Sequence, residues 1–480
     1  MVINMKQKIS VLLLLAMLAS LVSCGSELDV TPTTTAGEET TEAETTPASP
    51  IASYLPDTNL DGFELRVACA RANNGKDFWS DEANGEVVND AVYDSVRAVN
   101  EKFNAKLTPV FYDTNPTEVL TYALPIIQAG DDVFDLLQGH DGMMWNTSLE
   151  GYFTDIRSLK YQDFSQPWYP KNANDAYEIN GKQYVFSSYL SYSSLSMSKV
   201  IFMNKDIIND FGLELPYDDI CAGKWTLDKM FSMAKSVYTD LDGDEKTSEG
   251  DMVGFLAYNK LYGFQAAFVE CYVEGSDGKI SIDYDKERFV DVVTRMNDLL
   301  TSESTYVTGN EPDPKIFIDG RALFFYSGLS TMESEEMRSM KHDFGVIPVP
   351  KYDEKQEDYI TPAFDTQLAI SKTSKELDKV SLLIEAYSSA GYNIVRDAYF
   401  KTALQDKYTR DEDTVEMLNI ISNTLKVDLA YLNTDAGING LGRAFMYCFS
   451  NPDKGVISYL DSIASAEQVK VDKINEFFSE

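Results

Sequence analysis

Histidine is almost absent from the 480-residue sequence, which contains only His140 and His342. A Ser-His-Asp hydrolase would have to use one of these two, and the sequence has no G-x-S-x-G motif around a serine nucleophile. Positive charge is also scarce: 41 Lys and Arg residues stand against 77 Asp and Glu residues, and the formal net charge is −36. Because such a surface repels phosphate groups, nucleic acid is not expected as a partner. We interpret the acidity as a source of solubility.

Cysteine is rare and widely spaced. The five cysteines, Cys24, Cys69, Cys221, Cys271 and Cys448, include no C-x-x-C pair, so a zinc site is not expected. Cys69 lies in an apolar strand pattern and Cys448 in an aromatic helix pattern. We expect the four cysteines after Cys24 to be buried free thiols, and two disulfides remain the alternative.

The apolar run at residues 9–22 is too short for a membrane-spanning helix, which needs about 20 residues. Lys6 and Lys8 precede it, which is the pattern of a secretory signal peptide. The stretch "LVSC" that ends at Cys24 resembles the lipobox of bacterial lipoproteins. That resemblance implies a signal peptide at residues 1–23 and acylation of Cys24, for example by palmitate. An ordinary signal peptide with a chance cysteine is the alternative.

Residues 24–56 are rich in Thr, Glu and Pro and poor in aliphatic side chains. Such a segment cannot bury enough apolar surface to offset the entropy lost on ordering, so we expect a disordered, extended tether. With a lipid at Cys24, the tether would hold an extracytoplasmic body at the outer face of the bacterial cell membrane. Two acyl chains give stable anchoring where one does not.

The body begins with a strand–helix alternation. "FELRVACA" at residues 63–70 reads as a buried strand, and residues 88–103 place apolar side chains on one helical face. Strand-like "KLTPVFYD", a helix stopped by Gly130 and strand-like "VFDLLQ" follow. This order predicts an α/β fold with a parallel sheet. "YEINGKQYVF" predicts a hairpin around its Asn-Gly pair.

The order of several segments resembles the extracellular solute-binding proteins of ABC importers, family 1, which include maltodextrin-binding proteins. The matching segments are "EKFNAKLTPV", "AGDDVFDLL", "GYFTDIRSL", "INGKQYVFSS", "VIFMNKDIINDFGLELP", "KWTLDKMFSMAK", "FIDGRALFF" and "DFGVIPVPK". The resemblance implies a type II, two-lobed periplasmic-binding-protein-like fold. It implies an N-lobe at 57–192 and 364–394 and a C-lobe at 193–363 and 395–480.

By the same resemblance, the chain is a monomeric binding protein without catalytic activity. It would capture a sugar or oligosaccharide between its lobes and deliver it to permease subunits, with no required cofactor. Three alternatives stay open. They are a glycoside-active enzyme with two carboxylates about 5–9.5 Å apart, a surface adhesin or sensor on the same fold, and a binder of polyamines or peptides.

A sugar site needs carboxylates, amides and aromatic rings. His140-Asp141 follow a buried strand and match a His-Asp pair of maltodextrin-binding proteins, whose carboxylate bonds sugar hydroxyls; the basic residue that follows there is Gly142 here. Asp141 could instead lie in a solvated turn, and Trp145 could instead pack inside a lobe. The segment after the first strand could be an ordinary surface loop. Further candidates lie after strands or at expected crossings between lobes: Asn73, Trp79, Trp145, Tyr192, Tyr326 and Asp365. Asn439, before a C-terminal helix, is another.

"DLDGDEKTSEGD" at residues 240–251 has the length of an EF-hand calcium loop. Its carboxylates Asp240, Asp242, Asp244 and Asp251 occupy positions 1, 3, 5 and 12. Glu245 stands where that loop normally has glycine, and Asp251 is shorter than the usual bidentate Glu. The loop therefore predicts either a structural calcium site or a solvated acidic turn.

Overall fold

The computed structural model describes residues 49–71, 75–258, 261, 263–309, 313–363, 366–405, 412–433 and 440–479. The expected signal peptide, Cys24 and the tether up to residue 48 lie outside these ranges. The stretch Ser49–Glu480 forms one compact unit. Ile51 and Leu55 are buried in it, and the N–H of Ala52 donates to Ser389 Oγ at 3.0 Å. The packed chain therefore starts upstream of the predicted boundary at residue 57.

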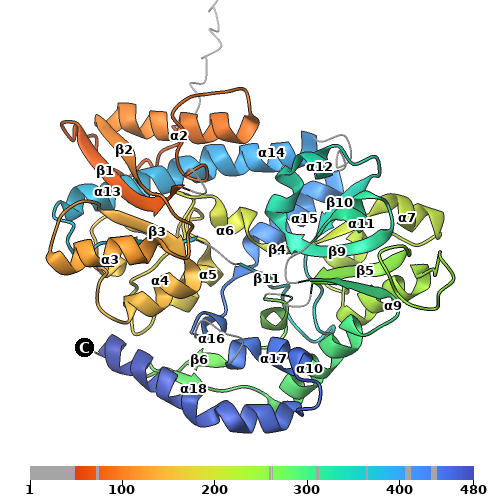
Figure 1. The fold of residues 1–480 in the computed structure, drawn as a ribbon. Coiled ribbons are helices and arrows are strands. Elements are labelled where there is room, and N and C mark those ends of the chain that lie inside the picture. The colour runs from red at the N-terminus through yellow and green to blue at the C-terminus, as the bar shows by residue number, and fades with distance from the viewer. Residues whose placement is uncertain are drawn as a thin grey trace, which may run out of the picture. The chain divides into compact units, whose positions relative to one another are not determined.

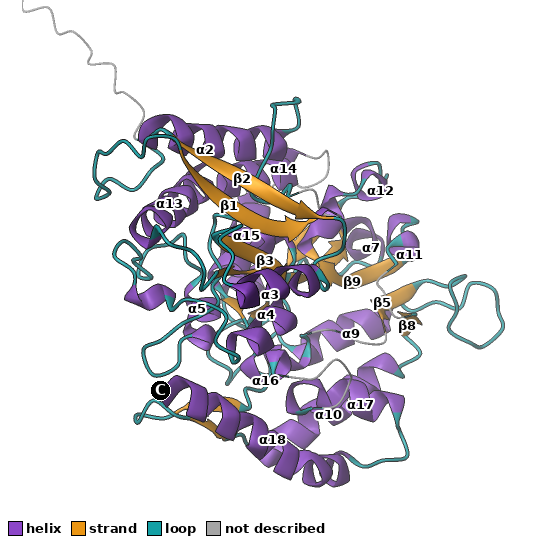
Figure 2. Ribbon diagram, turned by 60° about the vertical axis from the view of Figure 1, so that its left-hand side comes forward, coloured by secondary structure: helices purple, strands orange, loops and turns teal. Residues whose placement is uncertain are grey.

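The first sheet has the order β12-β3-β1-β2, and Figures 1 and 2 label its strands β1, β2 and β3. Its strands are β1 (Phe63–Ala70), β2 (Ala105–Tyr112), β3 (Leu136–His140) and β12 (Thr366–Ile370). β1 runs parallel to β2 and β3, and β12 runs antiparallel to β3. Buried side chains of α2 (Val87–Phe103) and α13 (Leu377–Ala390) cluster with one face of β1, and those of α3 (Val119–Ala129) and α4 (Asp141–Ser148) with the other. The predicted parallel strand–helix unit is confirmed.

Local sequence explains the helices of this sheet. α2 keeps Val92, Val96 and Val99 buried on one face. α3 ends at Gly130, whose φ of 78° is a left-handed conformation that glycine adopts without strain. The predicted helix stop at Gly130 is confirmed.

The second sheet has the order β10-β4-β9-β5-β8. Its strands are β4 (Lys199–Asn204), β5 (Val253–Tyr258), β8 (Thr305–Thr308), β9 (Ala322–Gly328) and β10 (Phe344–Ile347). β4 is antiparallel to β9 and β10, whereas β5 is parallel to β8 and β9. β5 and β9 are buried along their whole length, as expected for strands covered on both faces. The helices between these strands are α7 (Lys205–Asp210), α8 (Tyr217–Cys221), α9 (Leu227–Val237), α10 (Lys286–Leu300), α11 (Lys315–Ile318) and α12 (Glu335–Arg338).

The chain passes between the two sheets more than once. It reaches β4 through α6 (Ser193–Ser196) and returns to β12 after β11 (Thr361–Pro362), which pairs with β13 (Leu425–Lys426). After α13 it leaves through a π-helical turn, η5 (Gly391–Arg396), and α14 (Asp397–Gln405), which packs against both α2 and α15 (Glu412–Asn423). These segments connect the two sheets.

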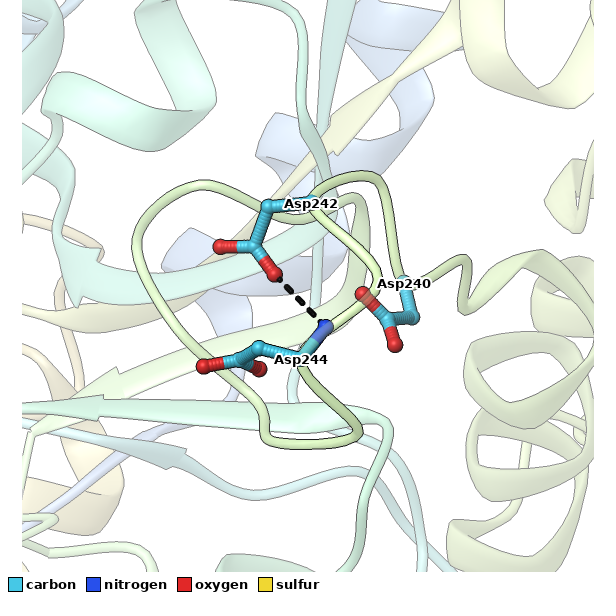
Figure 3. A group of neighbouring side chains, drawn as sticks. All are labelled: Asp240, Asp242 and Asp244. Atoms are coloured by element: carbon cyan, nitrogen blue, oxygen red, sulfur yellow. Dashed lines mark hydrogen bonds between the residues drawn. The ribbon is translucent and has the colours of Figure 1, made fainter.

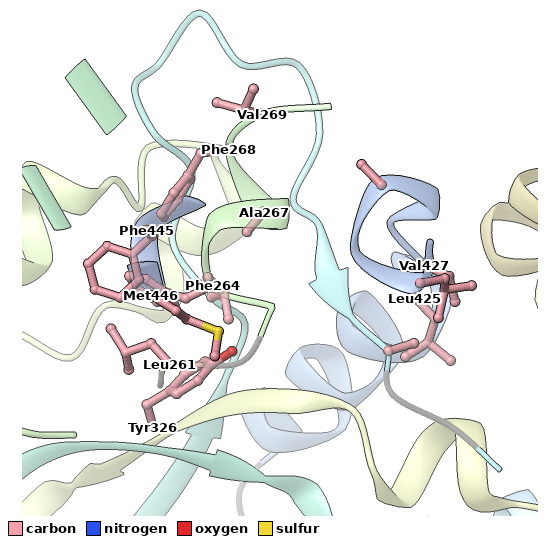
Figure 4. Packing of buried hydrophobic residues seen from close by; sticks show 14 of the residues in the cluster. Leu261, Phe264, Ala267, Phe268, Val269, Tyr326, Leu425, Val427, Phe445 and Met446 are labelled. Carbon is pink, nitrogen blue, oxygen red and sulfur yellow. The ribbon is translucent and has the colours of Figure 1, made fainter. Parts of the chain in front are cut away.

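The C-terminal part completes the core. α18 (Val456–Ser479) packs against α10, α17 (Ala444–Ser450) and the hairpin of β6 (Tyr272–Glu274) and β7 (Ile280–Ile282). Figure 4 shows Phe445 and Met446 of α17 packed near Phe264 and Tyr326. The remaining short elements are η2 (Ile156–Ser158), α5 (Lys171–Tyr177), η3 (Gln265–Ala267), α16 (Leu429–Leu432) and η6 (Leu441–Arg443).

Three details differ from the sequence reading. β3 starts at Leu136, three residues later than predicted, because Asp135 instead pairs with Arg66 at 2.9 Å. The predicted Asn180-Gly181 turn forms with φ of 51° and 73°, but only the single bridge Ile179–Lys182 flanks it. β5 and β8 were not predicted.

The described cysteines are free thiols, as expected. Cys69, Cys271 and Cys448 are buried, but Cys221 is exposed because it ends the short surface helix α8. Within the described ranges, the structure contains no helix with the length and hydropathy needed to cross a membrane.

Candidate functional site

A cavity of about 370 Å³ lies between the two sheets, where strands of the first sheet end. The loop after β1, the start of α4 and the first residue of β12 form one side. The segment around α6 and the 3-10 helix η4 (Leu329–Glu333), which follows β9 of the second sheet, form the rest. Ligands of open α/β sheets gather at such strand ends. The described residues that line the cavity are Lys76, Asp77, Pro116, His140, Asp141, Tyr192, Ser193, Ser196, Met197, Ser330, Glu333 and Thr366.

Asp77 is a buried carboxylate in this lining. Gln138 Nε2 and Ser191 Oγ both donate to its Oδ2, and the N–H of Tyr192 donates to its backbone oxygen at 3.0 Å. Burial raises the pKa of Asp77, although the bonds from Ser191 and Gln138 act in the opposite direction. Asp77 therefore ties the loop after β1 to β3 and to the first crossing segment.

His140 and Asp141 form the junction of β3 and α4. Asp141 is the first residue of the helix and is only 3% exposed. Its Oδ1 accepts the N–H of Gly142 at 2.6 Å and lies 3.0 Å from His140 Nδ1. A carboxylate is favoured at a helix N-terminus, where backbone N–H groups carry partial positive charge. Asp141 directly follows the buried strand β3, as predicted, and it is the first residue of a helix.

Glu333 reaches the cavity from the second sheet. Tyr399 OH donates to Glu333 Oε1 at 2.9 Å, and Lys76 Nζ lies 3.5 Å from Glu333 Oε2. Lys76 follows β1, so this ion pair joins a segment of the first sheet to a segment of the second.

Tyr192 supplies the aromatic surface of the lining. Its ring lies 5.3 Å from that of Tyr399. Burial raises the pKa of Tyr192, and the nearby carboxylates of Glu333 and Asp77 add to the rise. The hydroxyl therefore stays protonated at neutral pH. Beside it, Thr366 Oγ1 donates to Ser193 Oγ at 3.0 Å, which joins β12 to α6.

The lining combines hydroxyl groups, carboxylates, an imidazole and an aromatic ring with the apolar side chains of Pro116 and Met197. Charged acceptors and hydroxyls can bond the hydroxyl edges of a polyol, and rings can cover its apolar faces. A cavity of this size falls within the range of about 300–1,000 Å³ that is usual for small-molecule sites.

The structure brings together two of the predicted site residues, because Asp141 and Tyr192 both line the cavity. Three others pack elsewhere. Trp79 packs edge-on against Phe111 at 5.9 Å, Trp145 stacks on Phe478 at 6.2 Å, and Tyr326 stacks on Tyr258 at 6.1 Å. Asn73, Asp365 and Asn439 lie outside the described residues.

Sequence reasoning missed Asp77 and Glu333. Asp77 stands in the loop after β1 from which Asn73 and Trp79 were chosen. It adjoins Lys76, and two adjacent charged residues just after a buried strand are a sequence signal that could have identified Asp77 as a candidate. Glu333 carries no comparable signal, because many glutamates of this acidic chain follow strands or helices.

Two larger cavities, of about 710 and 500 Å³, lie away from these strand ends. Their linings include none of the described residues that follow β1 or β3 or that begin β12, whereas the lining of the 370 Å³ cavity includes Asp77, Asp141 and Thr366. We therefore take the 370 Å³ cavity as the candidate ligand site.

The acidic loop at residues 240–251 lies outside this site. Carboxylate oxygens of Asp240, Asp242 and Asp244 lie within 4.8 Å of one another (Figure 3). Glu245, which stands at the glycine position, has a φ of 62°. Asp251 is buried and accepts the N–H groups of Leu241 and Ser248 at 3.0 and 2.7 Å. Calcium binding by this loop stays a prediction.

Comparison with known proteins yields no matching family model and no matching curated protein. Several solved structures do match. A sugar transporter from Rhizobium etli is 14% identical over 87% of this chain and 99% of its own, with a TM-score of 0.55. UgpB from Mycobacterium tuberculosis, in complex with glycerophosphocholine, is 15% identical over 86% and 98%, with a TM-score of 0.54. The maltose/maltodextrin-binding domain MalE from Bdellovibrio bacteriovorus, bound to maltotriose, is 11% identical over 85% and 99%, with a TM-score of 0.53.

At these identities the comparisons establish the fold. The chain has the two-lobed α/β fold of periplasmic-binding-protein-like structures, with mixed, open sheets, as the order of its segments predicted.

Proposed function

We propose that the chain is a substrate-binding protein of an ABC importer. It captures a sugar or oligosaccharide in the cavity between its lobes and delivers it to a membrane permease. The observation that carries this proposal is the convergence of Asp77, Asp141 and Glu333 with serine and threonine hydroxyls at strand ends between two sheets. The likeness to MalE bound to maltotriose and to UgpB bound to glycerophosphocholine supports a polyhydroxylated small molecule.

The residues have distinct roles in this proposal. Asp141, fixed by the N–H of Gly142, accepts sugar hydroxyls, and Tyr192 covers an apolar ring face. Glu333 meets the ligand from the other lobe. Ligand binding favours closure only through contacts that the closed arrangement makes better than the open one, so a ligand held by both lobes is required.

The proposal extends to the location of the protein. The "LVSC" stretch supports export and acylation of Cys24, and the Thr- and Glu-rich tether would then hold a monomeric, extracytoplasmic body at the cell membrane. The permease subunits would be its partners. We propose no catalytic step, and calcium in the acidic loop would be structural only.

A thermal-shift screen of the purified body against sugars, polyamines and short peptides tests the proposal. A ligand that binds only the folded state stabilises it by about 2.7 kcal/mol at a hundred times its Kd. We expect a sugar to raise Tm and to be recovered unchanged after incubation. Tight binding of a polyamine or peptide with no response to sugars would contradict the sugar proposal, and released products would favour the glycoside-active alternative.

A further inference from the structure

Two ion pairs of opposite sense connect the first lobe to the second. Lys76, after β1 of the first sheet, lies 3.5 Å from Glu333 of η4. Glu86, the N-cap residue of α2, lies 3.7 Å from Arg338, the last residue of α12. In the first pair the first lobe supplies the cation, and in the second it supplies the anion.

We propose that the pairs Lys76–Glu333 and Glu86–Arg338 form an electrostatic latch that favours the closed arrangement of the lobes and thereby raises ligand affinity. The inference rests on the proposed function, because it concerns the regulation of the same site. The latch makes closure, and with it affinity, depend on ionic strength.

The second lobe holds its two latch residues on one short continuous segment. η4 ends at Glu333 and α12 runs from Glu335 to Arg338, so the two charges lie close in sequence. Tyr399 OH fixes Glu333 through a 2.9 Å bond, and Ser334 Oγ caps α12 by accepting the N–H of Met337 at 3.2 Å. The two charges are therefore presented at fixed positions, which reduces the entropy lost when the pairs form.

The two pairs have opposite polarity, because the first lobe supplies the cation of one and the anion of the other. This polarity fixes how the two lobes align. Sliding one lobe so that Lys76 met Arg338, or Glu86 met Glu333, would place like charges together. Only the observed alignment satisfies both pairs, so the latch selects one closed arrangement as well as stabilising it.

The solvent exposure of the paired side chains sets how strongly each ion pair can favour lobe closure. The side chains of Lys76 and Glu86 are both 68% exposed, so water and salt screen each pair. An exposed pair shifts an equilibrium by about 1.4- to fivefold. When the closed and open states are about equally populated, a fivefold loss lowers the closed fraction from about one half to about one sixth. Apparent Kd varies inversely with that fraction, so loss of either pair should raise Kd by up to about threefold and should also expand the ligand-free protein.

Charge reversal and charge exchange test the latch. The single variants are Lys76→Glu, Glu333→Lys, Glu86→Arg and Arg338→Glu. The two exchanged doubles, Lys76→Glu/Glu333→Lys and Glu86→Arg/Arg338→Glu, swap the charges within each pair. Glu86 and Arg338 are absent from the described cavity lining, so their pair reports on closure without a ligand contact. The controls are Lys286→Glu, which breaks a 3.0 Å pair with Asp461 inside one lobe, and Arg97→Glu, which breaks a 2.9 Å pair with Asp94 inside α2. Each control matches the charge change of Lys76→Glu or Arg338→Glu.

Small-angle X-ray scattering of the ligand-free body gives the first measurement. We expect Lys76→Glu and Arg338→Glu to increase the radius of gyration at low salt, the exchanged doubles to restore it, and the controls to leave it unchanged. High salt should expand the wild type in the same way. Radii that are equal in all variants and at all salt concentrations would overturn the latch.

Calorimetry with the sugar found by screening gives the second measurement, which is the Kd of each variant. Kd should rise with salt in the wild type and less steeply in Arg338→Glu, and the double Glu86→Arg/Arg338→Glu should regain wild-type affinity. An exchanged double that binds no better than its single variants would also overturn the latch. Because the scattering needs no ligand, a protein that binds no sugar but opens on charge reversal would contradict the proposed function and leave the latch standing.

Discussion

Replacing Asp141 by Ala should weaken sugar binding by about tenfold to a hundredfold. The carboxylate lines the cavity, is 3% exposed, and is oriented by the N–H of Gly142 at 2.6 Å. Hydrogen bonds to a charged acceptor are worth about 1.5–3 kcal/mol each. Loss of one such bond in a closed site corresponds to about a tenfold to hundredfold change in Kd.

The same substitution should lower stability only slightly. Asp141 is the first residue of α4, where a negative charge contributes about 0.3–1 kcal/mol through the partial positive charge of the helix N-terminus. The variant should therefore remain folded. Asp141→Asn keeps the shape of the side chain and removes its charge, so it should fall between wild type and Asp141→Ala in affinity.

Isothermal titration calorimetry on the sugar found by screening measures the effect. Asp131→Ala is the matched control, because Asp131 is an exposed carboxylate of the same lobe just after α3. Circular dichroism and the melting temperature check that each variant is folded. Equal affinities of wild type and Asp141→Ala would remove Asp141 from the site and refute the reasoning from its position.

Three further predictions concern the anchor, the acidic loop and a buried carboxylate. Cys24→Ala should move the protein from the membrane fraction to the soluble fraction; retention with unchanged mass on fractionation and mass spectrometry would contradict acylation at Cys24. Excess calcium should raise Tm relative to a chelator, and Asp242→Asn should remove the difference; identical melting curves would leave a solvated turn. Burial raises the pKa of Asp428 to about 7, well above the unfolded value of about 3.9, so the folded state binds the proton more tightly. Its contribution to stability is then complete at pH 4 and is lost as pH rises to about 7, by a few kcal/mol at most. Asp428→Asn should flatten the fall of Tm between pH 4 and 7, and an unchanged slope would show that other groups cause it.

Local patterns predicted the regular elements well. β1 occupies the predicted residues because Leu65, Val67 and Cys69 face one packed helix layer while Ala68 faces the other, which leaves an apolar run at residues 67–70. β3 was misplaced because Asp135 is buried by its pairing with Arg66, and that partner cannot be recognised from the local sequence. β5 was not predicted because Gly254 interrupts the apolar run "VGFLAY", and glycine is unfavourable inside a strand.

The site was harder to predict than the fold. Asp141, which lines the cavity, was selected because its strand and its neighbour His140 match a known pattern. Trp145 stands four residues later, yet it packs against Phe478 near the other end of the chain, and only the tertiary structure shows that partner. Glu333 enters the cavity from the second lobe through η4, a placement that depends on how the two sheets face each other.

A crystal structure of the body with the sugar selected by screening tests the central claim most directly. The account predicts the sugar between Asp141 of one lobe and Glu333 of the other, with a ring face on Tyr192. A sugar bound in the 710 Å³ cavity, or on the surface of a single lobe, would contradict the assignment of the site and with it the proposed capture between lobes.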